Sequence, residues 1–185
     1  MAHTEAVLRV ATPDDAPAVE AVMKQSAAAH FLQWYDEPQA ASAVVHVAHV
    51  DPLLLADGTY YILEADGEAV ACGGWSRRGK LYTGSGDAAD DARIIDPATE
   101  PARVRAMFVR SDWTRRGLGR AILDACESAA RAEGFSALVL GATLAGEPLY
   151  RAFGFREVER FMITMPDGVE VEVVAMERPI SPAAA

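Results

Sequence analysis

Residues 113–123, WTRRGLGRAIL, place three arginines and two glycines immediately before an alanine- and leucine-rich helical pattern. The first N–H groups of a helix have no partner within it, and the dipole makes this end positive, so a glycine-containing turn there can bind a phosphate. Gly117 and Gly119 leave the backbone open to such an anion. The residues that would add positive charge are Arg115, Arg116 and Arg120. The same stretch can equally form a surface turn with solvated arginines.

The quoted turn lies inside a strand–helix–strand pattern. Residues 103–109 are predicted to form the first strand. Leu118, Ile122 and Cys126 then recur at helical spacing, and Gly134 is a natural end for that helix. Residues 137–140 are short and continuously apolar, which is typical of a strand covered on both faces.

The rest of the chain continues the alternation of strands and helices. Asp66-Gly67 favours a two-residue hairpin turn, and Thr12-Pro13-Asp14-Asp15 is typical of a helix start. The predicted elements are a strand over 6–11, a helix to residue 29, a helix from Pro38 that ends before Asp51-Pro52, strands over 59–65 and 68–77, a polar loop over 84–101, a short helix over 147–152, strands over 155–165 and 169–177, and a frayed tail over 181–185.

Composition limits the class of protein. A chain of 185 residues with 51% hydrophobic content fits one domain with a sizeable core. Residues 101–160 carry 10 − 7 = +3, and the remainder carries 7 − 20 = −13, which gives the net charge of −10. Such an acidic chain is not expected to bind nucleic acid. No apolar run is long enough to span a membrane, so we expect a soluble, cytoplasmic protein. The two cysteines have no metal-binding spacing, and we expect no disulfide framework.

Two familiar phosphate-binding patterns do not fit the quoted stretch. A dinucleotide fingerprint needs glycine or alanine where Ile122 stands, and a P-loop needs Gly-Lys-Ser/Thr. A second glycine pair, Gly84-Ser85-Gly86, is followed by aspartates that would repel phosphate, so it is interpreted as part of a loop.

Two motifs resemble one known family. Met107-Phe108-Val109 at a strand end, followed by the segment 114–120, TRRGLGR, resembles the acyl-CoA-binding motif of the GNAT superfamily of N-acetyltransferases. Downstream, the segment 149–155, LYRAFGF, resembles the LYxxxGF segment of those enzymes. The order of elements matches over nearly the whole chain. The resemblance implies a single α/β (α+β) domain with a mixed, V-shaped twisted sheet and helices on both faces.

The resemblance also implies acetyl-CoA as the acyl donor. Its pantetheine arm would enter the gap between the two parallel strands, and its diphosphate would lie on the turn before the helix. The implied cofactor-binding residues are Met107, Phe108, Val109, Arg115, Arg116, Gly117, Leu118, Gly119 and Arg120. The sequence departs from the family pattern at Thr114, usually Gln or Arg, and at Thr143, often Asn, and the second change can alter how the pantetheine arm or the short helix is anchored.

The reaction suggests roles for two residues. The backbone N–H of Val109 can polarise the thioester carbonyl. Tyr150 is our candidate to protonate the leaving thiolate. A phenol has an ordinary pKa of about 10 and keeps its proton at neutral pH, and the ordinary pKa of a thiol is about 8.5. The alternative for Tyr150 is simple packing, with its hydroxyl bonded to backbone.

The sequence names no general base and no metal site. The candidates for a base are His30, His46, His49, Glu64 and Asp112. His46 and His49 are three residues apart on one helix face, but they have no evident third ligand, so packing or surface roles are favoured over a metal.

The expected function is transfer of an acetyl group from acetyl-CoA to a primary amine of a small molecule. The resemblance implies that residues 31–35 lie near the acceptor pocket and set substrate choice, but these residues can equally anchor their loop to the core. A peptide amine is a less favoured acceptor. The alternatives are a non-catalytic acyl-CoA-binding sensor and, more weakly, a nucleotide-binding domain. Either a monomer or a homodimer is compatible with the sequence.

Overall fold

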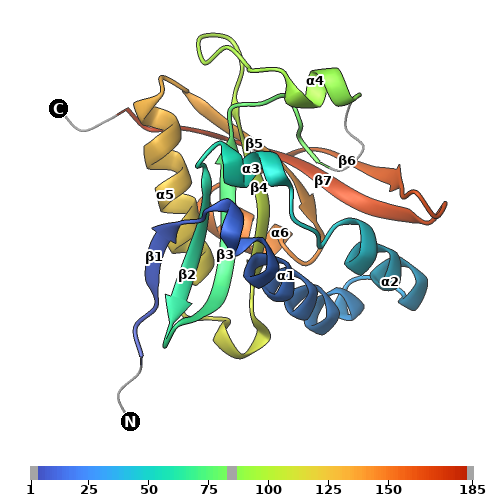
Figure 1. Ribbon diagram of the computed structural model, residues 1–185. Coiled ribbons are helices and arrows are strands. Elements are labelled where there is room, and N and C mark those ends of the chain that lie inside the picture. Colours follow the sequence, from blue (N-terminus) through green and yellow to red (C-terminus); the bar gives the residue numbers. More distant parts are fainter. Residues whose placement is uncertain (1–3, 83–86, 183–185) are drawn as a thin grey trace.

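Strand β4 lies in the middle of a seven-stranded sheet with the order β1-β2-β3-β4-β5-β7-β6 (Figure 1). The computed structural model describes residues 4–82 and 87–182. The strands are β1 (Val7–Val10), β2 (Tyr60–Ala65), β3 (Glu68–Ser76), β4 (Ala102–Val109), β5 (Ala137–Thr143), β6 (Arg156–Thr164) and β7 (Glu170–Pro179). The helices are α1 (Ala16–His30), α2 (Glu37–His46), α3 (Pro52–Ala56), α4 (Ala88–Ala92), α5 (Leu118–Ala132) and α6 (Glu147–Phe153), with short 3-10 turns η1 (Pro13–Asp15), η2 (Phe31–Gln33) and η3 (Ser111–Trp113).

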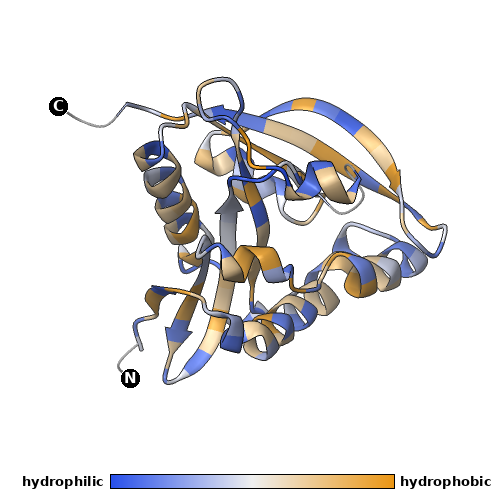
Figure 2. Ribbon diagram, turned by 45° about the horizontal axis from the view of Figure 1, so that its top comes forward, coloured by the Kyte–Doolittle hydropathy of each residue, from blue (hydrophilic) through white to orange (hydrophobic). Residues whose placement is uncertain are grey.

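Helices cover both faces of the sheet, as the family resemblance implies. Successive side chains of a strand point to opposite faces, so Tyr60 and Ile62 pack with α1, α2 and α3, whereas Tyr61 and Leu63 pack with α5 and α6. Hydrophilic and hydrophobic residues likewise alternate at the start of β7, over residues 170–173 (Figure 2). The sheet therefore separates two apolar clusters, one under each layer of helices.

The parallel strands β4 and β5 separate soon after they begin. They pair only at Ala102↔Leu138 and Arg103↔Val139. Beyond this point β4 stays paired with β3 as far as Val109, and β5 stays paired with β7 as far as Thr143. The two halves of the sheet thus diverge, which confirms the expected V shape and opens a gap beside the second half of β4.

Two local predictions are confirmed by backbone geometry. Asp66 and Gly67 have φ values of 52° and 79°, so both central residues of the β2–β3 turn are left-handed, as a tight hairpin requires. Thr12 caps η1 in a reciprocal arrangement with Asp15, whose carboxylate accepts hydrogen bonds from the Thr12 N–H and hydroxyl.

Two segments differ from the sequence-based prediction. The helix from Pro38 ends earlier, at His46, and a separate helix, α3, begins at Pro52 because Asp51 caps it by accepting a hydrogen bond from the Leu53 N–H at 3.0 Å. The polar segment 84–101 is not entirely loop, since Asp87 accepts from the Asp90 N–H at 2.8 Å and starts α4. In both places an aspartate acts as an N-cap, a signal that the loop interpretation overlooked.

Two predicted segments extend beyond the described residues. Residues 84–86 of the polar loop and residues 183–185 of the tail are not described. Ser181, which belongs to the tail expected to fray, accepts a hydrogen bond at its carbonyl from Arg131 Nε at 2.7 Å. Within residues 4–82 and 87–182, no helix has the length and apolar character needed to cross a membrane.

Candidate active site

A cavity of about 410 Å³ occupies the gap between β4 and β5. One end is formed by the turn before α5 together with Leu149 and Tyr150, on the α5 face of the sheet. The other end is formed by residues of the opposite face, among them Ser26, His30 and Phe31. The cavity therefore connects the two faces of the sheet, and a ligand on one side can meet a ligand on the other within the gap.

The turn before α5 has the backbone geometry of an anion site. Arg115 and Gly117 have φ values of 61° and 77°, so the chain reverses just before the helix, and no atom would contact a Cβ at position 117. Within α5 the first main-chain bond runs from the Ala121 N–H to the Gly117 carbonyl at 3.0 Å. The N–H groups of residues 118–120 have no acceptor inside the helix and remain free for an anion.

The three arginines of this turn do not point the same way. Arg115 and Arg120 line the cavity, and both are solvent-exposed. Arg116 is not among the lining residues: its guanidinium stacks on the Trp113 ring at 4.3 Å and donates to the Asp112 carbonyl at 3.4 Å. The structure thus brings eight of the nine predicted cofactor-binding residues to the cavity, Met107, Phe108, Val109, Arg115, Gly117, Leu118, Gly119 and Arg120.

Strand β4 offers hydrogen-bonding groups to the cavity at its far end. The Arg110 N–H donates to the Val70 carbonyl of β3 at 2.9 Å, and Phe108 pairs with Cys72. Because hydrogen-bonded residues alternate along an antiparallel pair, the N–H of Val109 faces away from β3, toward the gap. This is the orientation that a role in polarising a carbonyl requires.

Tyr150 lies deep in the cavity wall. It is 7% exposed, its ring packs edge-on to Phe155 at 5.8 Å, and a side chain at Gly146 would come within 3.0 Å of that ring. Burial raises the pKa of the Tyr150 phenol well above its usual value, so it stays protonated at neutral pH. Its hydroxyl has no hydrogen-bond partner among the described residues, and the packing alternative therefore lacks the expected backbone bond.

The candidate bases fall into two groups. His30 and His49 line the cavity, and His30 Nε2 is buried without a hydrogen-bond partner among the described residues. The others are held elsewhere: His46 by Asp167 at 3.6 Å, Glu64 by Arg9 at 2.8 Å, and Asp112 by Arg110 at 2.7 Å. Across the described part of the chain, no cluster of three or more His, Cys, Asp or Glu side chains could hold a metal ion.

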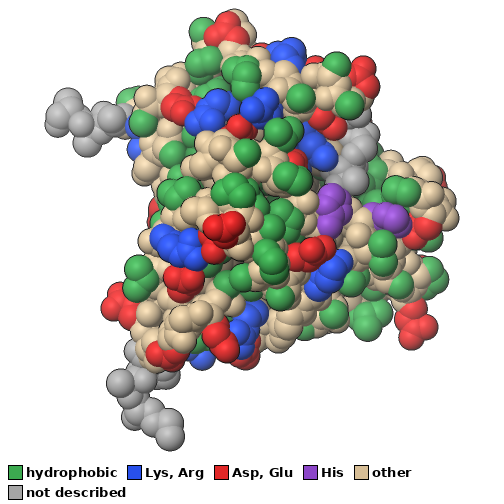
Figure 3. All heavy atoms as spheres, viewed as in Figure 1, with side chains coloured by type: hydrophobic (Ala, Val, Ile, Leu, Met, Phe, Trp, Pro, Cys, Tyr) green, Lys and Arg blue, Asp and Glu red, His purple; other side chains and the backbone are tan. Residues whose placement is uncertain are grey.

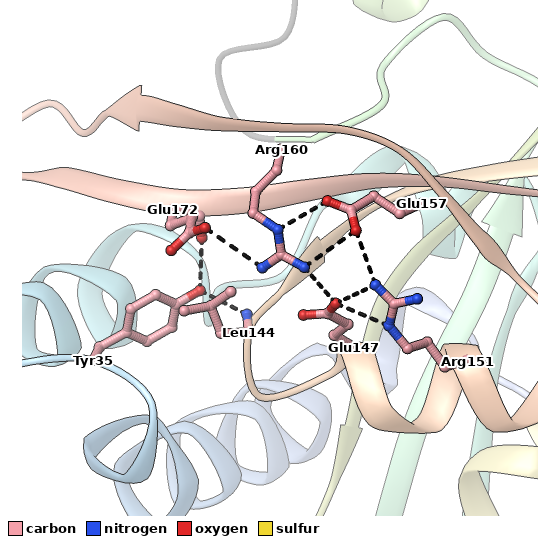
Figure 4. Close-up of polar contacts among 7 residues, drawn as sticks. All are labelled: Tyr35, Leu144, Glu147, Arg151, Glu157, Arg160 and Glu172. Carbon is pink, nitrogen blue, oxygen red and sulfur yellow. Dashed lines mark hydrogen bonds and ion pairs between the residues drawn. The ribbon is translucent and has the colours of Figure 1, made fainter.

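A polar network that the sequence analysis did not identify holds the segment leading to Tyr150 (Figure 4). The Tyr35 hydroxyl accepts from the Leu144 N–H at 2.8 Å and donates to the Glu172 carbonyl at 2.9 Å. Glu147, at the start of α6, accepts from Arg151 and Arg160 at 2.7 and 2.6 Å. Burial by itself would raise the pKa of Glu147, but the two arginines outweigh it and the pKa is lowered.

A buried ion pair at the second end of the cavity was also missed. Arg105 Nη2 lies 3.3 Å from Asp51 Oδ2, and both residues line the cavity. Arg105 is on β4 and Asp51 precedes α3, so 54 residues separate them in the sequence. No local pattern could have paired them.

The cavity matches the parts of an acyl-CoA molecule. Free N–H groups and two arginines at the head of α5 suit its diphosphate, and the gap between β4 and β5 has a strand edge along which an amide-containing arm can hydrogen-bond. A buried tyrosine hydroxyl lies in the same cavity. The residues present therefore fit this donor.

Comparison with known proteins agrees with this fit. The model of the acetyltransferase (GNAT) domain matches residues 56–157, more than half of the chain. No curated protein matches the sequence.

Solved structures share the fold at low sequence identity. A GCN5-related N-acetyltransferase from Rhodopseudomonas palustris aligns with a TM-score of 0.72 and 18% identity, over 97% of this chain and 98% of that one. The PaiA N-acetyltransferase from Thermoplasma acidophilum, solved with coenzyme A, aligns with a TM-score of 0.65 and 14% identity over 94% and 98%. The ribosomal-protein-S18-alanine N-acetyltransferase from Escherichia coli aligns with a TM-score of 0.59 and 20% identity over 97% and 96%. The chain belongs to the GNAT acetyltransferase family and is an acyl-CoA-dependent N-acetyltransferase.

Proposed function

We propose that this enzyme acetylates the primary amine of a small molecule by direct attack on acetyl-CoA, with Tyr150 as the general acid. The observation that carries the proposal is the cavity, which joins the α5 turn to the opposite face of the sheet and contains the Tyr150 side chain. Donor and acceptor would enter from opposite faces and meet beside the end of β4.

The chain's residues have distinct tasks in this proposal. The N–H groups of residues 118–120, with Arg115 and Arg120, bind the diphosphate, and the edge of β4 binds the pantetheine arm. When bound, acetyl-CoA supplies the activated acyl group. The Val109 N–H donates a hydrogen bond to the thioester oxygen and stabilises the charge that grows there during attack.

Proton transfer completes the reaction. As the amine nitrogen forms its bond to the acyl carbon, the carbon–sulfur bond breaks and Tyr150 gives its proton to the leaving sulfur. The nitrogen loses one proton to the solvent of the cavity, and solvent returns one to Tyr150. The raised pKa of the buried phenol keeps the group protonated between turnovers. It also makes the phenol a weaker acid, so proton transfer follows the growth of negative charge on the leaving sulfur.

We favour a small molecule over a protein as the acceptor, because the acceptor end belongs to a cavity of only about 410 Å³. This end is formed by the end of α1, the segment before α3 and residues 81–82, and it includes the buried Arg105. A peptide amine is the second candidate, since two structural neighbours are named as ribosomal-protein-alanine N-acetyltransferases. Acidic and basic side chains are interspersed on the face shown in Figure 3, which offers no continuous basic surface to nucleic acid.

The proposal is tested in two steps. Calorimetric titration with acetyl-CoA, ATP and NAD at one salt concentration should show selective binding of acetyl-CoA. A thiol-release assay should then show turnover with a panel of small primary amines and weaker turnover with peptides that have free N-termini. Turnover with peptides alone would contradict the small-molecule assignment, and binding without turnover on any amine would contradict the proposed reaction.

A further inference from the structure

The acceptor end of the cavity contains one charged side chain from the floor of the sheet, Arg105. It is 9% exposed, and it lies on the face of β4 that packs against α1, α2 and α3. Arg115 and Arg120 are at the opposite end, on the α5 turn. A guanidinium is rarely buried to this degree unless its charge and its N–H groups are compensated.

The compensation given by the protein is incomplete. Arginine has five N–H donors, and within residues 4–82 and 87–182 the hydrogen bond that Arg105 makes goes to Asp51, at 3.3 Å. The Asp51 carboxylate also caps α3, because its other oxygen accepts from the Leu53 N–H at 3.0 Å. Burial lowers the pKa of Arg105, with Asp51 acting against this effect. Among the described residues, no Arg105 nitrogen is buried without a partner, so its remaining donors are open to the cavity that this residue lines.

The surroundings of Arg105 strengthen its attraction for an anion that reaches it. Phe31 and Val47 are apolar residues that line the cavity on the same face of the sheet, and an ion pair in apolar surroundings is screened less than one in water. A planar guanidinium matches a carboxylate with two parallel hydrogen bonds. Asp51 offsets the charge of Arg105, so a carboxylate arriving here is held by the directed N–H donors of the guanidinium that Asp51 leaves open.

We propose that Arg105 binds a carboxylate of the acceptor, so that the preferred substrates are amino acids rather than simple alkylamines. This inference rests on the proposed function, because it assumes that the acceptor enters from this face. Arg105 is a specificity-determining residue in this scheme, and Asp51 holds it in place.

The test compares L-amino acids with the amines that remain after removal of the carboxylate, for example leucine with 3-methylbutylamine and phenylalanine with phenethylamine. For each pair, kcat/KM is measured by thiol release in the wild type, Arg105→Gln, Arg105→Lys and Arg103→Gln. Arg103 is a matched control on the same strand, and its guanidinium donates to the Pro101 carbonyl at 2.5 Å outside the cavity lining. Comparing the ratio within each pair between variants cancels the different pKa values of the amines.

We expect Arg105→Gln to lower the ratio of amino acid to alkylamine by about tenfold or more, the loss expected for a charge-assisted hydrogen bond, while Arg103→Gln leaves it unchanged. Arg105→Lys retains the charge and the pairing with Asp51, so it should retain part of the preference for the amino acid over the alkylamine. Calorimetric titration of the amino acid into CoA-saturated protein should show the same order of affinities without turnover. An equal fall for both members of each pair would mean a purely structural Arg105 and would overturn the inference while leaving the proposed function intact. Absence of turnover with every amine would overturn both.

Discussion

Tyr35 makes two long-range hydrogen bonds near the site. The side chain is 6% exposed, and its hydroxyl joins the Leu144 N–H, just after β5, to the Glu172 carbonyl in β7. Burial raises its pKa to about 12, so the hydroxyl stays neutral and able to donate. The Tyr35→Phe variant removes only the oxygen and keeps the edge-on ring contact with Phe31 at 5.9 Å.

The loss of stability in Tyr35→Phe follows from the two backbone groups that lose their hydrogen-bond partner. Removing the hydroxyl deprives one partly buried N–H and one carbonyl of a partner, which should lower the free energy of unfolding by about 2–3 kcal/mol. For a chain of this size that is a fall in Tm of roughly 5–10 °C. Because residue 144 leads into α6, kcat should also fall, whereas the affinity for acetyl-CoA should change little.

Urea unfolding of wild type and Tyr35→Phe measures the free energy, and hydrogen exchange at the Leu144 amide reports the local effect. Exchange at that amide should accelerate by about tenfold or more, since its acceptor is gone. A loss of less than about 0.5 kcal/mol with unchanged exchange at Leu144 would refute the reasoning, because it would mean that solvent replaces the hydroxyl without cost.

Three further variants test other parts of the account. Gly74→Ala places a Cβ 2.7 Å from a Cα of β2 and should lower the free energy of unfolding by about 1–3 kcal/mol in urea titrations; unchanged stability would contradict the tight approach of β2 and β3. Arg120→Gln should raise the Kd of acetyl-CoA by roughly threefold to tenfold at low salt and by less at high salt. The matched control Arg116→Gln should leave the Kd unchanged. Equal effects of the two substitutions would contradict the different orientations of these side chains. A hydrogen bond from Arg78 holds the pKa of Asp57 below its usual value, so Asp57→Asn should lower the free energy of unfolding by about 1 kcal/mol at pH 7. This difference should shrink below about pH 4 and vanish below the pKa of Asp57 in the folded protein. A difference that stays constant down to about pH 2 would contradict this reasoning.

Local sequence signals predicted most of the fold. The two-residue turn at Asp66-Gly67, the glycine-containing start of α5 and the period of its apolar face each depend on neighbours within a few residues. The parallel pairing of β4 with β5 follows once α5 is recognised as the crossover between them, whereas the position of β7 between β5 and β6 does not. β5 proved longer than the apolar run 137–140, because pairing with β7 extends it to Thr143.

The remainder depends on contacts that sequence spacing does not encode. Arg115, Arg116 and Arg120 look alike in the sequence, but the Trp113 ring draws Arg116 away from the cavity. Tyr35 and Leu144 are 109 residues apart. The candidate bases could be narrowed to His30 and His49 only after the fold showed which side chains line the cavity.

The central claim is that Tyr150 delivers the proton to the leaving thiol. The most direct test is steady-state thiol release by Tyr150→Phe on the best amine of the panel, together with the Kd of acetyl-CoA by calorimetry. The account predicts a fall in kcat of about 100-fold or more with the Kd unchanged within roughly threefold, because the phenylalanine ring keeps the packing against Phe155 and lacks only the proton donor. An unchanged kcat would contradict the claim and remove Tyr150 from the chemistry.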